Sequence, residues 1–325
     1  MIKNDFKEIN RAIDSSKTIF IAGHEMPDGD SVGSSIAMAS ILEKMGKKVT
    51  LYKDGPFPFN FMFLKGAKKA VETLPGEMPD LFIILDSGSP ERVGKALYHF
   101  MDSSKSKKIL FDHHTLKKEN DRFFDIVFSD PTASATAVIV YRWAMEKGLK
   151  LDKEESEAIY SAIISDTGGL RYRGTNKESF VILSELLDKI DLDKISTEIY
   201  ENVPLEQLKM LSEVLADLRV LADGKAAVIK ITLEQMEKYK LSSDYVESFV
   251  NYARSIKGVQ IAVRFREKGG NLWKASLRSH GEINANELAS KFGGGGHKNA
   301  AGFIFKGSFE EGIKAVEEMV KSVSI

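Results

Sequence analysis

Short apolar runs alternate with longer amphipathic segments along the first half of the chain. The apolar runs predict buried β-strands at residues 18–22, 48–52, 81–85 and 109–111. The segments with helical spacing of apolar residues predict helices at 6–15, 31–45, 133–147 and 153–165. Strands separated by helices favour a parallel sheet with right-handed crossover connections.

The second half of the chain alternates in the same way, after a charged helical stretch from Ser179 to about Glu206. Its pattern predicts strands at 226–231, 259–265 and 272–277, and helices at 244–255, 286–292 and 308–323. We therefore predict an α/β protein with a cleft between two domains. The larger domain, with a mostly parallel sheet flanked by helices, is expected at residues 1–190, a helical linker at 191–205, and a smaller α/β domain at 206–325.

The composition is that of an ordinary globular protein, because 43% of the 325 residues are hydrophobic. The first residues lack the apolar stretch of a signal peptide, and no apolar run approaches the ~20 residues of a membrane helix. The chain has no cysteine, which excludes disulfides and thiolate metal sites and fits a reducing cytoplasm. A cytoplasmic protein without a membrane segment is therefore expected.

Charge and residue types restrict the ligands further. The formal net charge is −1, so no overall electrostatic field draws this protein to nucleic acid. Without cysteine, any metal must be held by His, Asp and Glu, and such ligands favour harder ions such as Mn²⁺ or Mg²⁺.

Acidic and imidazole side chains follow the predicted strands at the points where the strands end. In chain order they are the motif His24-x-x-x-Asp28-x-Asp30, then Asp86, then Asp112-His113-His114, while Asp166 follows a predicted helix. Strand ends at one edge of a parallel sheet lie close together, and ligands bind there in open α/β folds. We therefore expect these side chains to converge on one site.

Each of these residues alone has an ordinary structural explanation. A single Asp28 or Asp30 is more often a turn or N-cap residue, Asp86 could cap the next helix, and Asp166 could form an Asx-turn before Gly168. Gathered carboxylates, however, repel one another unless cations neutralise them. Two divalent ions ~3.5–4 Å apart resolve this repulsion, and such pairs catalyse in-line displacement at phosphorus.

A glycine-rich segment in the second half is a candidate anion site. Gly293 to Gly296 alone are more often a flexible loop, but His297 and a return to a strand favour a phosphate cradle with backbone N–H donors. A Walker-type loop is excluded, because no Gly-Lys-Ser/Thr follows. Arg264 lies in the predicted strand 259–265, and Ser276 and Arg278 lie in the stretch 275–279 at the end of the next one. Such residues are more often at solvated edges than ligands.

These motifs together resemble a known family. His24 to Ser34, Asp86-Ser87, Asp112-His113-His114 and Asp166-Thr167-Gly168 look like the four successive motifs of the DHH phosphoesterase superfamily. Gly293 to Gly302 looks like the signature of its DHHA1 substrate-binding domain. The motifs occur in the family's order, and the NrnA-like branch is the most similar. That branch comprises bifunctional oligoribonucleases and 3′-phosphoadenosine 5′-phosphate (pAp) phosphatases, with stand-alone pApA phosphodiesterases.

The resemblance implies a role for each matching residue. One metal would be held by His24, Asp28 and Asp86, and the other by Asp30, Asp86, His113 and Asp166, with Asp86 bridging. Asp112 would orient an imidazole and His114 would face the scissile phosphate, although the residues themselves do not separate His113 from His114. The substrate would be held by Arg264, Ser276, Arg278, Gly294, Gly295, Gly296 and His297. The family usually carries Mn²⁺, with Mg²⁺ or Co²⁺ as alternatives.

The implied activity is hydrolysis of short oligoribonucleotides or linear dinucleotides such as pApA to nucleoside monophosphates, and of pAp to AMP and phosphate. The sequence does not show the regularly interleaved aromatic residues that line a long RNA-binding groove. We therefore expect short substrates. The alternatives are a cyclic-di-AMP phosphodiesterase, a pyrophosphatase or polyphosphatase and, from another class, a nucleic-acid-binding module. Family members often form homodimers, but no stripe of residues here identifies an interface.

Overall fold

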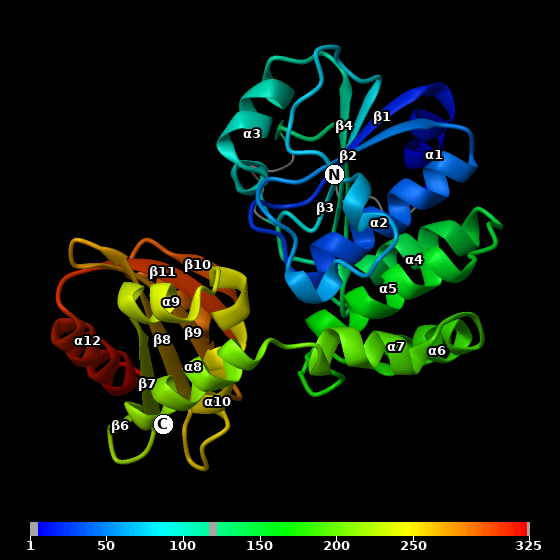
Figure 1. Ribbon diagram of the computed structural model, residues 1–325. Helices are drawn as coiled ribbons and strands as arrows, with labels where there is room; N and C mark the ends of the chain where they lie inside the picture. The colour runs from blue at the N-terminus through cyan, green and yellow to red at the C-terminus, as the bar shows by residue number, and fades with distance from the viewer. Residues whose placement is uncertain (1–5, 117–121, 324–325) are drawn as a thin grey trace. The chain divides into compact units, whose positions relative to one another are not determined.

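The computed structural model describes residues 6–116 and 122–323 of the chain. The chain divides between Asn202 and Val203 into two compact units, which are described separately here. Each unit contains a β-sheet with helices packed on it (Figure 1). The predicted class, a two-domain α/β protein, is confirmed.

The first unit is built on a five-stranded sheet in which every pair of neighbours is parallel. Its strands are β1 (Thr18–Ala22), β2 (Lys48–Tyr52), β3 (Leu81–Leu85), β4 (Lys107–Asp112) and β5 (Ile126–Ser129), in the order β2-β1-β3-β4-β5. The direction of winding reverses between β1 and β3, and such a reversal opens a crevice at the carboxyl ends of the strands. The sequence pattern predicted four of these strands and missed the short β5.

Helices cover both faces of this sheet. They are α1 (Lys7–Ser15), α2 (Gly29–Lys44), α3 (Lys95–Asp102), α4 (Thr136–Glu146), α5 (Lys153–Asp166), α6 (Lys177–Leu186) and α7 (Leu192–Ser196), the last followed by a π-helical turn, Thr197–Glu201. Helices α1, α2, α4 and α5 contribute to one core and α3 to another on the opposite face. A Cβ at Gly33 would lie 2.5 Å from the Ala158 carbonyl oxygen, so glycine is what allows α2 to pack closely on α5.

Two helices of the first unit begin two or three residues away from their predicted starts. Helix α2 begins at Gly29 rather than Ser31, because the Asp28 side chain accepts hydrogen bonds from the backbone amides of Asp30 and Ser31 as an N-cap. Helix α4 begins at Thr136 rather than Ala133. Both shifts place residues of the candidate site at the first turn of a helix.

The second unit contains a six-stranded sheet in the order β10-β11-β9-β8-β7-β6, in which only β7 and β8 are parallel among the described pairs. Its elements are α8 (Leu205–Ala216), β6 (Arg219–Leu221), β7 (Ala226–Ile231), α9 (Leu233–Tyr239), a 3₁₀ helix (Ser243–Phe249), α10 (Val250–Arg254), β8 (Ile261–Gly269), β9 (Leu272–Ser279), α11 (Ala285–Ser290), β10 (Gly295–His297), β11 (Ala300–Lys306) and α12 (Phe309–Lys321). Helices α11 and α12 pack on one face of the sheet, and α8 and α10 on the other. The single helix predicted at 244–255 is therefore a 3₁₀ segment followed by a short α-helix.

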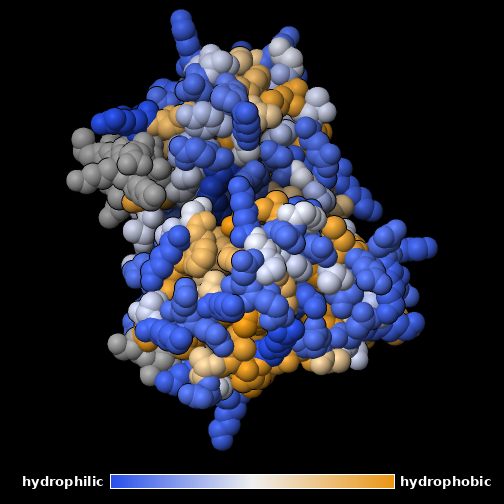
Figure 2. Space-filling model, turned by 90° about the vertical axis from the view of Figure 1, so that its left-hand side faces the viewer, coloured by the Kyte–Doolittle hydropathy of each residue, from blue (hydrophilic) through white to orange (hydrophobic). Residues whose placement is uncertain are grey.

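The surface is mixed in character. Figure 2 shows a largely hydrophilic face interrupted by hydrophobic residues. None of the described helices is long and apolar enough to cross a membrane.

Candidate active site

The crevice of the first sheet collects the residues that the sequence predicted as metal ligands. His24 follows β1, Asp86 directly follows β3, and His113 directly follows β4. These three strands are neighbours and run parallel, so their ends meet at one edge. Asp30 comes from the first turn of α2 and Asp166 is the last residue of α5, so both helices deliver a carboxylate to the same edge.

The first group of side chains contains His24, Asp28 and Asp86. Nε2 of His24 lies 3.7 Å from Oδ2 of Asp28 and 3.9 Å from Oδ2 of Asp86. Nδ1 of His24 is 2.8 Å from the Glu25 carbonyl oxygen, to which it donates a hydrogen bond. This bond leaves the Nε2 lone pair directed at the two carboxylates, which is the tautomer that a metal ligand requires. Asp28 is therefore both an N-cap and a member of this group.

The second group contains His113, Asp30 and Asp166. Nε2 of His113 lies 3.8 Å from Oδ2 of Asp30 and 3.6 Å from Oδ2 of Asp166. Nδ1 of His113 lies 3.2 Å from the Ala133 carbonyl oxygen, so this imidazole also turns Nε2 toward carboxylates. The ligand atoms within each of the two groups lie within 4.8 Å of one another, close enough to hold one ion.

Asp86 lies between the two groups. Its Oδ2 faces His24 at 3.9 Å, and its Oδ1 lies 3.5 Å from Nε2 of His113. The backbone at Asp86 has φ of +58°, an uncommon conformation for a residue with a side chain, and its amide donates to the Phe111 carbonyl at 3.0 Å. The strained turn after β3 thus aims one carboxylate oxygen at each group.

Asp112 and His114 form a hydrogen-bonded pair beside these groups. Nδ1 of His114 donates to Oδ1 of Asp112 at 2.5 Å, and the backbone amides of His114 and Gly88 donate to the two oxygens of Asp112 at 2.8 and 2.6 Å. Burial acts to raise the pKa of Asp112, but these bonds outweigh it and hold the pKa below its ordinary value. Asp112 is therefore an ionised support for His114, whose Nδ1 also lies 3.4 Å from Oδ1 of Asp86.

The electrostatics of the cluster fit a site for divalent cations. Burial, with a further contribution from nearby carboxylates, raises the pKa of Asp30 to about 7 and the pKa of Asp86 well above its usual range. Burial likewise raises the pKa of Asp166. Carboxylate oxygens and imidazole nitrogens suit first-row divalent ions, and such ions would let all three acids ionise.

Helix α4 supplies contacts that the sequence did not predict. The backbone amides of Thr136 and Ala137 donate to the Asp30 carboxylate at 2.6 and 3.1 Å, and the Thr136 hydroxyl donates to Oδ1 of Asp86 at 3.1 Å. The positive end of a helix thereby stabilises negative charge on Asp30. In the sequence, Thr136 is recognisable only as a hydroxyl residue near the start of a predicted helix. Many residues fit that description, so the sequence alone does not single out Thr136.

The predicted substrate residues all belong to the second unit. Arg264 on β8 pairs in register with Ser276 on β9, and Arg278 lies two residues further along β9. Arg264 is fully buried, and its guanidinium donates to the Val246 carbonyl, to Oε2 of Glu247 at 2.9 Å and to Ser276 Oγ at 2.7 Å. The hydrogen bonds of the Arg264 side chain therefore all go to residues of the second unit, whereas the Arg278 side chain is partly exposed to solvent.

Glu247 is a second residue that the sequence did not single out. Besides its bond to Arg264, its Oε1 lies 3.6 Å from Nζ of Lys274, and its side chain is 41% exposed. Burial acts to raise its pKa, but Arg264, Lys274 and Arg278 outweigh that effect and lower it. The ionised Glu247 carboxylate therefore compensates the positive charge of these three side chains.

The glycine-rich segment forms the β10–β11 hairpin. A Cβ at Gly294 would lie 2.2 Å from the Gly302 carbonyl oxygen, and one at Gly296 would lie 2.5 Å from the Ala300 carbonyl oxygen. The amides of Gly293, Gly294 and Gly296 donate to Ser290, Ala289 and Asn286. Gly294 and Gly296 are required by close backbone packing, and an anion here would need other donors or would replace these bonds. Gly295 and His297 pair with Gly302 and Ala300 across the hairpin.

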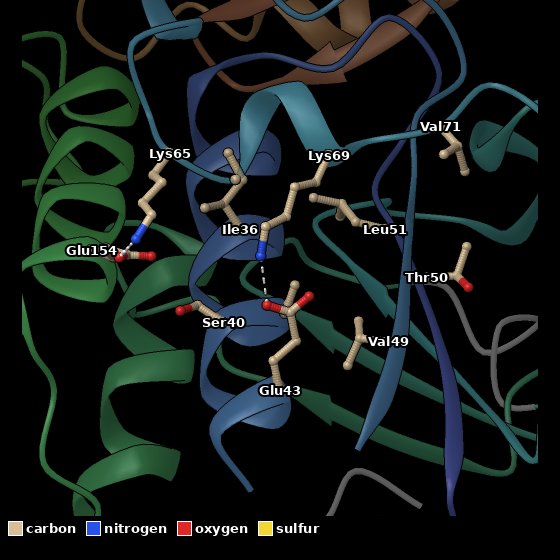
Figure 3. Close-up of a pocket in the computed structure, with 12 residues that line it drawn as sticks. Ile36, Ser40, Glu43, Val49, Thr50, Leu51, Lys65, Lys69, Val71 and Glu154 are labelled. Carbon is tan, nitrogen blue, oxygen red and sulfur yellow. Dashed lines mark hydrogen bonds and ion pairs between the residues drawn. The ribbon is translucent and has the colours of Figure 1, made fainter. Parts of the chain in front are cut away.

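A pocket elsewhere in the first unit does not belong to this site. It lies among α2, β2 and the segment around Lys65 and Lys69, and it contains none of the predicted ligands (Figure 3). Its charged residues pair with each other, Lys69 with Glu43 at 2.8 Å and Lys65 with Glu154. Each charged side chain of this pocket therefore already has a partner of opposite charge, so the pocket is not suited to an ionic ligand.

The fold and the site define a class of enzyme, the metal-dependent phosphoesterases, in which buried carboxylates and imidazoles gather at the ends of parallel strands. The "DHH family, N-terminal domain" matches residues 18–163, and the "DHHA1 domain" matches residues 223–322. The chain belongs to the DHH family of phosphoesterases. The resemblance inferred from the sequence motifs is therefore confirmed.

Individual relatives agree with this assignment. The chain is 30% identical to "Bifunctional oligoribonuclease and PAP phosphatase NrnA" of Thermus thermophilus over 96% of this chain and 92% of that protein. It is 26% identical to the protein of the same name from Bacillus subtilis, over 91% of each chain. The crystal structure of an exopolyphosphatase-related protein from Bacteroides fragilis superposes with a TM-score of 0.88, at 30% identity, over 98% of this chain and 95% of that chain.

Proposed function

We propose that this protein is a phosphodiesterase that hydrolyses short oligoribonucleotides and linear dinucleotides such as pApA to nucleoside monophosphates, and pAp to AMP and phosphate. The observation that carries the proposal is the position of Asp86, with one oxygen toward His24 and the other toward His113. That arrangement suits a pair of ions sharing one carboxylate, as used in phosphoryl chemistry. The names of the Thermus and Bacillus relatives support the choice of substrate.

The residues of the first unit would hold two divalent ions, most simply Mn²⁺. His24, Asp28 and Asp86 would hold one, and Asp30, Asp86, His113 and Asp166 the other. Bound there, the ions would lower the pKa of a shared water and neutralise charge on the phosphoryl oxygens.

The roles of the remaining residues follow from their contacts. Asp112 accepts the Nδ1–H of His114 and so fixes the ring, and Nε2 of His114 would face the scissile phosphate. In the imidazolium form both ring nitrogens carry a proton, and in that form Nε2 would donate a hydrogen bond to a phosphate oxygen. The α4 amides keep Asp30 in place for the ion that it would share with His113. In this proposal the protein positions groups and neutralises charge, which are the main contributions to phosphoryl transfer.

We assign recognition of the terminal phosphate to the second unit. Arg278 on β9 pairs in register with Ala300 on β11, and Ala300 pairs in turn with His297 on β10, the next strand of the sheet. A guanidinium can grip a phosphate through two parallel hydrogen bonds, which suits recognition of a chain end. Arg264 and Ser276, which are buried and hydrogen-bonded to each other, would hold the strands that carry these residues in place. We propose residues 1–190 as the catalytic domain, 191–205 as a helical linker and 206–325 as the substrate-binding domain.

Two rival functions use similar chemistry. A pyrophosphatase or a cyclic-di-AMP phosphodiesterase would need the same acidic ligands, and only the substrate would differ. The experiment is Mn²⁺-dependent turnover of a matched panel consisting of pApA, a five-nucleotide RNA, pAp, cyclic di-AMP and pyrophosphate. The expected result is rapid release of AMP from pApA, with pyrophosphate unchanged. Preferential hydrolysis of pyrophosphate or of cyclic di-AMP would overturn the proposed substrate class.

A further inference from the structure

Arg92 is a cation at the edge of the active site to which the motifs give no role. It belongs to a short 3₁₀ helix, Pro90–Val93, which begins four residues after Asp86. The Arg92 carbonyl accepts a hydrogen bond of 2.6 Å from the Glu25 amide, and the Glu25 carbonyl in turn accepts from Nδ1 of His24. The Arg92 backbone is therefore tied to the residue that orients His24.

The Arg92 side chain reaches back over Gly88 toward His114. A Cβ built on Gly88 would lie 3.1 Å from Nη1 of Arg92 and 3.6 Å from Cγ of His114. The guanidinium and the imidazole are thus neighbours across a glycine that has no side chain to separate them. Gly88 also has φ of +69°, and its amide donates to Asp112, the residue that holds His114. One short turn therefore links Arg92, His114 and Asp112.

Among the residues that the structure describes, none neutralises the charge of Arg92. Its guanidinium has no hydrogen bond or ion pair with any residue in the ranges 6–116 and 122–323, and Arg92 is exposed. Other arginines of the first unit do form ion pairs, such as Arg142 with Asp130 and Glu178. An exposed arginine beside a cluster of acids is positioned for an anion that arrives from solution.

We infer that Arg92 is a catalytic residue that contacts a non-bridging oxygen of the scissile phosphate, on the same side as His114. This inference rests on the proposed function. As water attacks phosphorus and the leaving oxygen departs, negative charge redistributes over the phosphoryl oxygens and the leaving group. The Arg92 guanidinium then supplies N–H donors beside His114, and it stabilises the transition state more than the ground state.

The test compares Arg92→Ala, Arg92→Lys and a matched control, Arg11→Ala, since Arg11 is exposed on α1. Each is assayed with pApA and Mn²⁺, its bound Mn²⁺ is counted by mass spectrometry, and Arg92→Ala is assayed again with added guanidinium ion. Removal of one preorganised donor of this kind lowers kcat about 10²–10³-fold. We expect that loss for Arg92→Ala with KM changed much less, partial activity for Arg92→Lys, recovery with guanidinium, and unchanged metal content.

Two results would overturn the inference. Arg92→Ala turnover within about twofold of wild type would exclude catalysis by Arg92, and a loss explained wholly by reduced Mn²⁺ content would make Arg92 a structural residue. Inactivity of the wild-type protein on pApA would instead contradict the proposed function. The variants would then be compared on whichever panel substrate the wild type hydrolyses, where the same kcat loss and guanidinium rescue decide the role of Arg92.

Discussion

Asp112 and His114 are joined by a hydrogen bond of 2.5 Å between a buried carboxylate oxygen and ring Nδ1. The neighbouring imidazole, His113, instead bonds through Nδ1 to a backbone carbonyl and faces three carboxylates with Nε2. Two adjacent histidines are therefore held in different ways. One faces carboxylates where a metal ligand would lie, and the other has a charged support suited to a residue that hydrogen-bonds substrate.

The first prediction concerns that support. Asp112→Asn keeps the size of the side chain but removes the charge and one of the oxygens that accept from Gly88 and His114. We expect kcat for pApA to fall about 10–100-fold, because residues that orient active-site imidazoles usually contribute that much. Bound Mn²⁺ should not change, since Asp112 is not among the proposed ligands. An equal loss of metal would contradict the assignment of Asp112 as a support.

The second prediction concerns the shared carboxylate. Asp86→Ala should abolish turnover with Mn²⁺ present and lower the number of bound ions, because the variant removes a ligand from both groups. Asp102→Ala is the matched control, since Asp102 is exposed at the end of α3 and should behave as wild type. Substantial residual activity in Asp86→Ala would exclude the bridging role.

The third prediction concerns pH in the metal-free protein. Asp30 has a folded-state pKa of about 7 against an ordinary value of 3.8, so its contribution to stability is fully present below pH 3.8 and is lost as the pH rises through about 7. The raised pKa values of Asp86 and Asp166 act in the same direction. With EDTA, the melting temperature should therefore be lower at about pH 8 than at about pH 5, and Mn²⁺ should restore it at the higher pH.

Asp30→Asn is the control for this pH effect, because the amide does not titrate. The variant should lose less stability than the metal-free wild type between the same two pH values. A wild-type melting temperature that stays constant or rises over this interval would show that the buried acids are not the source of the effect.

The fourth prediction separates the two arginines of the second unit. Arg264→Ala removes the hydrogen bonds to Glu247, Ser276 and the Val246 carbonyl and should cost about 3 kcal/mol in the free energy of unfolding. Arg278→Ala should instead raise KM for pApA by about tenfold or more, the value of a charge-assisted hydrogen bond, with little change in stability.

Lys257→Ala is a suitable control for both arginines, since Lys257 is exposed in the same unit. Denaturant unfolding and steady-state kinetics measure the two effects independently. A large stability loss in Arg278→Ala, or a pure KM effect in Arg264→Ala, would reverse the roles given to these residues.

Much of the fold could be predicted from the sequence because strands and helices in this chain carry clear periodicity. Strand ends at one edge of a parallel sheet must meet, so the gathering of His24, Asp86 and His113 followed from the strand pattern. The short strand β5, only four residues long, carries too little pattern to be recognised. The start of α2 was misplaced because Gly29 and the nearby proline favour a loop, whereas the Asp28 cap allows the helix to begin there.

Other features depend on contacts between segments distant in the sequence. The bonds from Thr136 and Ala137 to Asp30 come from backbone amides more than 100 residues away. The burial of Arg264 depends on the 3₁₀ segment Ser243–Phe249 that packs over its strand and supplies Glu247. Such partners have no local signature, so residue type alone does not separate a buried arginine from one at the surface.

The most direct test of this account is a crystal structure of the Mn²⁺-loaded protein with anomalous scattering used to locate the metal. We predict two manganese ions, one among His24, Asp28 and Asp86 and one among Asp30, His113 and Asp166, with Asp86 in contact with both. A single ion, or two ions of which Asp86 touches only one, would contradict it.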